Sequence, residues 1–229
     1  GFHNIRSIFL PIFSLSDTVE VYPSSTQGIE LSVSGFPVSS NSDNLCSRAA
    51  YLFCEYFQLQ PAYKIILHKN IPIASGLGGG SSDAAAVLLS LLSLEKQGLD
   101  YKALYPLAEQ LGSDVSFFLK PQLALCEGRG EIISPINDKI DLELFLLNPS
   151  FPIPVQWAYK NRKKADTEQA DIADMIAAIK ENNPEKIAEA CRNDLEIAIF
   201  EKYPILQIIR EELLQAGCYN VNISGSGPT

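Results

Sequence analysis

A glycine-rich segment that runs directly into an apolar helix constrains the fold more than any other feature of the sequence. Residues 76–86 read GLGGGSSDAAA, and the pattern predicts a helix over residues 82–97 with Gly98 just past its end. Apolar residues cover nearly the whole circumference of this helix and leave Ser90 and Ser93 as a narrow polar stripe. A helix of this kind has to be buried on most sides, so the chain needs a core that encloses it.

The same segment has the chemistry of an anion site. It lacks the Lys of a Walker A loop, and Ser81 stands where the dinucleotide fingerprint has its third glycine. Glycines let backbone amides come close to a ligand, and the amides and dipole of a helix N-terminus attract negative charge. A mobile linker or a tight turn would also use glycine. However, a linker rarely continues into a core helix, and a turn rarely needs three successive glycines. The segment therefore predicts a phosphate-binding loop.

A second motif, LGSDVSFFL at residues 111–119, places one carboxylate among apolar side chains. Asp114 follows Gly112 and precedes Val115 and two phenylalanines. A carboxylate in such surroundings is costly unless it is paired, and for that reason it often marks a working acid or base. An Asp that caps a short helix would give the same pattern. The local sequence leaves both interpretations open.

Composition and charge narrow the class of protein. The chain has 229 residues and a net charge of −9, which argues against a nucleic-acid or anionic-membrane partner. Its longest near-apolar run, Ala84 to Leu94, is too short to span a bilayer. Two histidines argue against a His-based metal site or a Ser-His-Asp triad. Five cysteines without CxxC spacing indicate reduced thiols in a cytosol.

Strand and helix patterns mix without a regular βαβ repeat, which predicts an α+β protein. Proline- and glycine-punctuated strands, a helix from about residue 45 and the strand AYKIILHK precede the glycine-rich segment. Beyond it, Asp100 caps a helix that Pro106 splits, and two strands flank the turn at residues 128–130. The sequence pattern changes after Lys139. There we expect a strand at LELFLLNP, helices near residues 168–182, 184–200 and 203–216, and a last strand at CYNVNI. We therefore expect two domains, residues 1–142 and 143–229.

Taken together, the motifs of the chain resemble those of the GHMP kinases, a superfamily of small-molecule kinases, over the whole length and in the same order. The loop and the aspartate motif are the specific matches, and SDNL at residues 42–45 is a weaker one. The other matching segments are GFHNI at 1–5, PIASGLGGGSSDAAA at 72–86, LGSDVSFF at 111–118, GRGE at 128–131 and SGSGPT at 224–229. The resemblance implies an N-terminal domain like the second domain of ribosomal protein S5 and a ferredoxin-like C-terminal domain.

The resemblance also implies an activity, that of an ATP-dependent kinase using Mg²⁺. It is strongest to the branch of the family that phosphorylates the erythritol hydroxyl of a cytidine diphosphate-linked methylerythritol in isoprenoid precursor biosynthesis. No metal ligand is assigned. By this resemblance, the ATP phosphates contact Pro72, Ile73, Ala74, Ser75, Gly76, Leu77, Gly78, Gly79, Gly80, Ser81 and Ser82.

The remaining roles follow from the same resemblance. Asp114 matches the catalytic Asp, which takes the proton from the attacking hydroxyl. Phe2 and His3 match positions that hold the cytosine, Tyr159 falls where an aromatic stacks on that ring, and Val155 lies beside the substrate. The catalytic Lys of the family precedes GFH, so no residue of this sequence takes that role.

Two alternatives stay open from the sequence: another GHMP kinase, acting on mevalonate or homoserine, and a nucleotide-binding protein without catalysis. The sequence starts at Gly1 without Met and stops at Thr229 inside a glycine-rich turn, so we expect further residues at both ends. We expect a cytoplasmic protein, with an organelle-targeting segment ahead of Gly1 left open.

Overall fold

The computed structural model describes residues 4–96, 98–163 and 172–229 of the chain, which forms two compact units. Unit 1 comprises Gly1–Ile73 and Gly78–Ile136, and unit 2 comprises Ala74–Leu77 and Asn137–Thr229. The centre of the glycine-rich loop therefore belongs, by its contacts, to the unit that contains the C-terminal part of the chain. The domain boundary expected near residue 142 stays a prediction.

Unit 1 contains a mixed three-stranded sheet in the order β2-β4-β3. β4 (Ala62–Lys69) is central and pairs antiparallel with β2 (Thr18–Pro23) and parallel with β3 (Gly28–Gly35). Side chains alternate along β4, so that Tyr63, Ile65, Leu67 and Lys69 are buried. The strand AYKIILHK predicted from the sequence is confirmed, and its inward row ends in a lysine.

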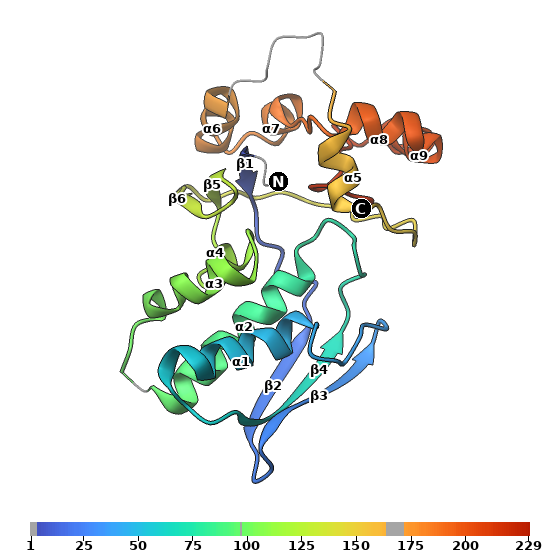
Figure 1. The fold of residues 1–229 in the computed structure, drawn as a ribbon. Coiled ribbons are helices and arrows are strands. Elements are labelled where there is room, and N and C mark those ends of the chain that lie inside the picture. Colours follow the sequence, from blue (N-terminus) through green and yellow to red (C-terminus); the bar gives the residue numbers. More distant parts are fainter. Residues whose placement is uncertain (1–3, 97, 164–171) are drawn as a thin grey trace. The chain divides into compact units, whose positions relative to one another are not determined.

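Two helices, α1 (Leu45–Phe57) and α2 (Gly79–Glu95), cover this sheet, as Figure 1 shows. α1 begins where the sequence predicts a helix, because the Asn44 side chain accepts a hydrogen bond from the Cys46 amide at 2.9 Å. α2 starts three residues earlier than the predicted Ser82. Gly79 and Gly80 are thus helical, and the last loop glycine, Gly78, is the residue that precedes the helix.

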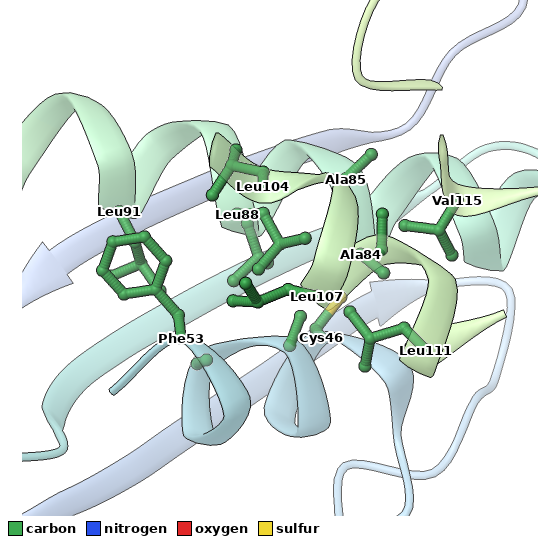
Figure 2. Packing of buried hydrophobic residues seen from close by; sticks show 14 of the residues in the cluster. Cys46, Phe53, Ala84, Ala85, Leu88, Leu91, Leu104, Leu107, Leu111 and Val115 are labelled. Atoms are coloured by element: carbon green, nitrogen blue, oxygen red, sulfur yellow. The ribbon is translucent and has the colours of Figure 1, made fainter. Parts of the chain in front are cut away.

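The core of unit 1 lies around α2, between α1 and α3 (Tyr105–Leu111), as Figure 2 shows. Leu88 and Leu91 of α2 are fully buried against Phe53 of α1 and Leu107 of α3. The prediction that the helix after the loop is a core helix is confirmed. Asp100 caps the short 3₁₀ turn Tyr101–Leu104 that leads into α3, which begins at the predicted proline break.

A second sheet of unit 1 is antiparallel in the order β1-β5-β6. β5 (Ala124–Gly128) and β6 (Ile132–Pro135) form the hairpin predicted around residues 128–130, and β1 (Ile5–Phe9) pairs with β5. The one-turn helix α4 (Val115–Phe118) directly follows Asp114. Phe117 of α4 packs against Phe9 of β1, with ring centroids 5.1 Å apart.

Unit 2 contains five short helices in its described residues. A buried cluster that includes Ile153, Ala158, Ile199 and Ile223 forms its core. Of the three helices predicted here, the second is two helices, because the chain turns away at residues 191–195. The helices are α5 (Val155–Lys160), α6 (Ile172–Lys180), α7 (Pro184–Ala190), α8 (Glu196–Lys202) and α9 (Pro204–Gln215).

Two strands expected in unit 2 are wrong. Within the described part of the chain, LELFLLNP and CYNVNI do not join a ladder. The backbone of CYNVNI bonds to side chains instead: the Val221 amide donates to Asn220 Oδ1, and the Ile223 amide donates to Glu196 Oε1 at 2.7 Å. The α+β class of the chain is nevertheless confirmed, since helices and both sheets are present. No helix among the described residues is long and apolar enough to cross a membrane.

Candidate functional site

The glycine-rich loop ends in a helix N-terminus suited to an anion. α2 has 17 residues, and its first turn carries neither an acidic residue nor a side-chain cap. The first amides of a helix lack intrahelical partners, and they carry the positive end of the helix dipole. Ser82 donates its hydroxyl to the Gly79 carbonyl at 2.8 Å, and its amide donates to the Gly78 carbonyl at 2.9 Å. These bonds fix the first turn and leave the earlier amides directed out of the helix.

The centre of the loop is held by the second glycine-serine turn, SGSG at residues 224–227. Ser224 donates its hydroxyl to the Gly76 carbonyl at 2.9 Å, and the Thr229 amide donates to the Ser75 carbonyl at 3.1 Å. Gly76 has φ +81°, and a Cβ there would lie 2.0 Å from the Ser224 carbonyl oxygen. Only glycine fits so close an approach in that conformation. The SGSG turn is therefore a support of the loop.

At the start of α2, unit 1 contains a buried charge cluster of Lys69, Asp17 and Asp83. The Lys69 ammonium donates to Asp83 Oδ2 at 2.7 Å and also to Asp17 Oδ2. All three side chains are at most 5% exposed, so their charges have lost most of their water. Asp17 also accepts from the Asn70 and Ile71 amides at 2.6 and 2.8 Å. The cluster thus joins the end of β4 to the first turns of α2.

Burial and hydrogen bonding shift the pKa values of the two carboxylates in opposite directions. Burial raises the pKa of Asp83 to about 7, against the opposing effect of Lys69, and the negative charge of Asp17 raises it further. Burial acts upward on Asp17 as well, but hydrogen bonds from Ile71, Lys69 and Asn70 outweigh it and lower the Asp17 pKa. The cluster is therefore close to neutral up to about pH 7, with the proton on Asp83.

Asp114 stands at the N-cap position of α4, yet its side chain makes no capping bond. The interpretation as a helix cap therefore fails. Asp114 Oδ1 would lie 3.3 Å from a Cβ on Gly130, so the glycine of the GRGE motif leaves room for the carboxylate. Burial raises the pKa of Asp114 above its usual value, which makes the carboxylate a better proton acceptor.

The helix that follows Asp114 packs against the end of the loop. A Cβ on Gly78 would lie 2.9 Å from the ring of Phe118, so α4 reaches the residue that precedes α2. Unit 1 thus brings the Asp114 helix beside the loop end. The expected roles of the loop residues and Asp114 stay predictions.

The residues expected to bind substrate fall in two places. Val155, 53% exposed, and Tyr159 lie four residues apart on α5 and so share one side of that helix. Tyr159 is partly buried against the unit 2 core. Phe2 and His3 lie outside the described residues. These four roles stay predictions.

Sequence reasoning missed the charge cluster and the contacts of the SGSG turn. A signal for Lys69 was present, because it continues the inward row of Tyr63, Ile65 and Leu67 at a spacing of two residues. Asp83 lies within the glycine-rich segment itself, but no local pattern assigns it a role. The SGSG contacts join residues 148 positions apart, and no local pattern reports them.

Two family models and several named proteins match this chain. Residues 44–121 match the GHMP kinases N terminal domain, and residues 175–229 match the GHMP kinases C terminal domain. Two similar proteins, from Geobacter metallireducens and Pelotomaculum thermopropionicum, are both named 4-diphosphocytidyl-2-C-methyl-D-erythritol kinase. The first is 34% identical over 232 residues and the second 36% over 230, and each match covers 100% of this chain and 80% of the relative.

Solved structures agree with these sequence matches. A crystal structure of a 4-(cytidine 5′-diphospho)-2C-methyl-D-erythritol kinase matches with a TM-score of 0.79 and 31% identity, over 100% of this chain and 80% of that one. A homoserine kinase from Cytophaga hutchinsonii matches with a TM-score of 0.71 and 16% identity, over 93% and 74% of the two chains. At that identity the second match speaks for the fold alone.

Proposed function

The chain belongs to the GHMP kinases, a family of ATP-dependent small-molecule kinases, and from that premise we propose that it phosphorylates 4-diphosphocytidyl-2-C-methyl-D-erythritol on an erythritol hydroxyl. The observation that carries this proposal is identity of 31–36% along the whole chain to relatives named for that reaction. With this substrate, the reaction would be a step in the biosynthesis of isoprenoid precursors. The partly exposed first turn of α2 and the supported loop favour this proposal, because such a kinase needs a phosphate site.

In the proposed reaction the loop residues 72–82 bind the phosphates of ATP, and Asp114 accepts the proton of the attacking hydroxyl. Phosphoryl transfer depends mainly on positioning and charge stabilisation, which a rigid loop beside a buried helix supplies. The raised pKa of Asp114 suits a general base. Phe2, His3, Tyr159 and Val155 are the proposed contacts of the cytidyl substrate.

Mg²⁺ belongs to the proposal as the partner of ATP. No group of three His, Cys, Asp or Glu suited to hold a metal ion occurs among the described residues. Mg²⁺ usually takes only one or two carboxylates together with phosphate oxygens and water, so a kinase does not need such a group to use the ion. When bound with ATP, the ion neutralises the charge of the phosphates. It is not assigned to a particular ligand set.

The proposal also places the protein in the cytoplasm, with a small-molecule substrate and no nucleic-acid partner. All five cysteines are free, and Cys46, Cys54 and Cys126 are buried, which suits a reducing cytoplasm. The net charge of −9 suits a small-molecule substrate better than a nucleic acid.

A thermal-shift measurement tests the substrate. The complete protein should be protected by cytidine 5′-diphosphate and by the cytidyl substrate, because both occupy a cytosine pocket, but by neither mevalonate nor homoserine. Protection and phosphorylation with mevalonate or homoserine alone would replace the proposed substrate. ATP binding without turnover of any of the three would support a non-catalytic nucleotide-binding protein.

A further inference from the structure

Asn193 lies between α7 and α8 and uses its whole side-chain amide in bonds to the backbone. Its Nδ2 group donates to the carbonyls of Ile223 and Gly225, each at 2.7 Å. Its Oδ1 accepts from the Leu195 amide at 3.0 Å. Two donors and one acceptor are satisfied at once, so the side chain has a single fixed orientation.

The two carbonyls that Asn193 holds flank Ser224, the residue that contacts the loop. Ser224 donates its hydroxyl to the Gly76 carbonyl, and its own carbonyl oxygen would lie 2.0 Å from a Cβ on Gly76. A shift of the SGSG turn therefore moves the loop centre or breaks this bond. The turn is held from a second side by Glu196, whose Oε1 accepts from the Ile223 amide at 2.7 Å.

We propose that Asn193 is a positioning residue for ATP, acting through the SGSG turn on the loop residues 74–77. This inference rests on the proposed kinase function for the identity of the ligand. The Asn193 amide bonds to the backbone of Ile223, Gly225 and Leu195, and its effect passes through the first two carbonyls to Ser224 and from there to Gly76. The Asn side chain suits this task because it offers two N–H donors on one atom, whereas an Asp would face both carbonyls with negative charge.

A second asparagine makes the proposal testable against a purely structural role. Asn220, also in unit 2, donates Nδ2 to the Ala188 and Cys191 carbonyls at 2.5 and 3.1 Å, and its Oδ1 accepts from the Val221 amide at 2.8 Å. The bond pattern is the same as that of Asn193, but the carbonyls belong to the end of α7. Asn220 is therefore a matched control that stabilises the unit without holding the SGSG turn.

The experiment compares Asn193→Ala, Asn193→Ser and Asn220→Ala in the complete enzyme. Melting temperature, the Kd for ATP from calorimetry, and kcat and KM for both substrates are measured. Asn193→Ala and Asn220→Ala should lower the melting temperature to a similar extent. Only Asn193→Ala should weaken ATP binding, by about tenfold for the two lost hydrogen bonds, while the KM for the second substrate changes little. Asn193→Ser retains one donor and should fall between wild type and Asn193→Ala.

Two results would overturn the inference. The first is an ATP affinity of Asn193→Ala that matches that of Asn220→Ala. The second is failure of both Asn193 variants to fold while Asn220→Ala folds, which would assign Asn193 to stability. Failure of the proposed function is distinguishable, because wild type would then bind ATP without phosphorylating the cytidyl substrate, and the Kd comparison would still decide the role of Asn193.

Discussion

Replacing Gly76 with alanine tests the contact between the glycine-rich loop and the SGSG turn. The φ of +81° costs an L-residue about 1–2 kcal/mol. The added Cβ would also lie 2.0 Å from the Ser224 carbonyl oxygen, a backbone atom that accepts from the Gly227 amide at 2.9 Å. Relief of this overlap separates loop and turn and loses the Ser224–Gly76 hydrogen bond, at about 0.5–1.5 kcal/mol for each bond broken. Gly76→Ala should therefore destabilise the protein by about 1.5–3.5 kcal/mol.

Gly217→Ala is the matched control within unit 2. Its φ is +103°, and nothing lies within 4 Å of the new Cβ, so it has the backbone strain without the overlap. Chemical denaturation should give a smaller loss for this variant, about 1–2 kcal/mol, with an unchanged KM for ATP. Gly76→Ala should in addition raise the KM for ATP about tenfold or more, since the loop amides are displaced. Equal effects of the two substitutions on stability and on KM would refute the argument.

Three further predictions concern chemistry, charge and packing. Asp114→Asn should lower kcat by about 10²–10⁴ with little change in KM, and near-native turnover would remove Asp114 from the role of general base. The Asp83 pKa of about 7 in the folded state lies above the ordinary value of 3.8, so the protonated carboxyl favours folding, and this stability is lost as pH rises through about 7. In denaturant titrations, Asp83→Asn should gain about 2–3 kcal/mol in unfolding free energy relative to wild type between pH 5 and pH 8, and parallel pH curves would contradict a pKa of Asp83 raised by burial. Leu88→Ala should lower the free energy of unfolding by about 2–5 kcal/mol, because the side chain is fully buried. Leu94 is 42% exposed, so Leu94→Ala should lower it far less. Similar losses from both substitutions would contradict the placement of α2 in the core.

Local patterns predicted unit 1 well because its elements carry their signals within a few residues. The Asn44 cap, the alternation along β4 and the proline at the start of α3 each depend on neighbours in the chain. The phosphate loop was predicted from glycines followed by an apolar helix, and that helix is buried as expected. The exact start of α2 was missed, because helix propensity disfavours Gly79 and Gly80 and tertiary packing outweighs that preference.

Unit 2 was predicted less well because distant partners decide it. The helix expected over residues 184–200 is interrupted where the Asn193 Oδ1 accepts from the Leu195 amide and its Nδ2 donates to carbonyls 30 and 32 residues away. An Asn-Asp pair inside a helical pattern was the available local signal. The apolar alternation of CYNVNI predicted a strand, but the Ile223 amide bonds to the buried Glu196 instead of a neighbouring strand. Such a partner is visible only in three dimensions.

The most direct test of the account is ATP consumption by the complete protein, measured as ADP release with Mg²⁺ present. We predict turnover that depends on 4-diphosphocytidyl-2-C-methyl-D-erythritol, with one ADP formed for each phosphorylated product and background levels with mevalonate or homoserine. No ADP release above background with the cytidyl substrate, or release that requires mevalonate or homoserine, would contradict it.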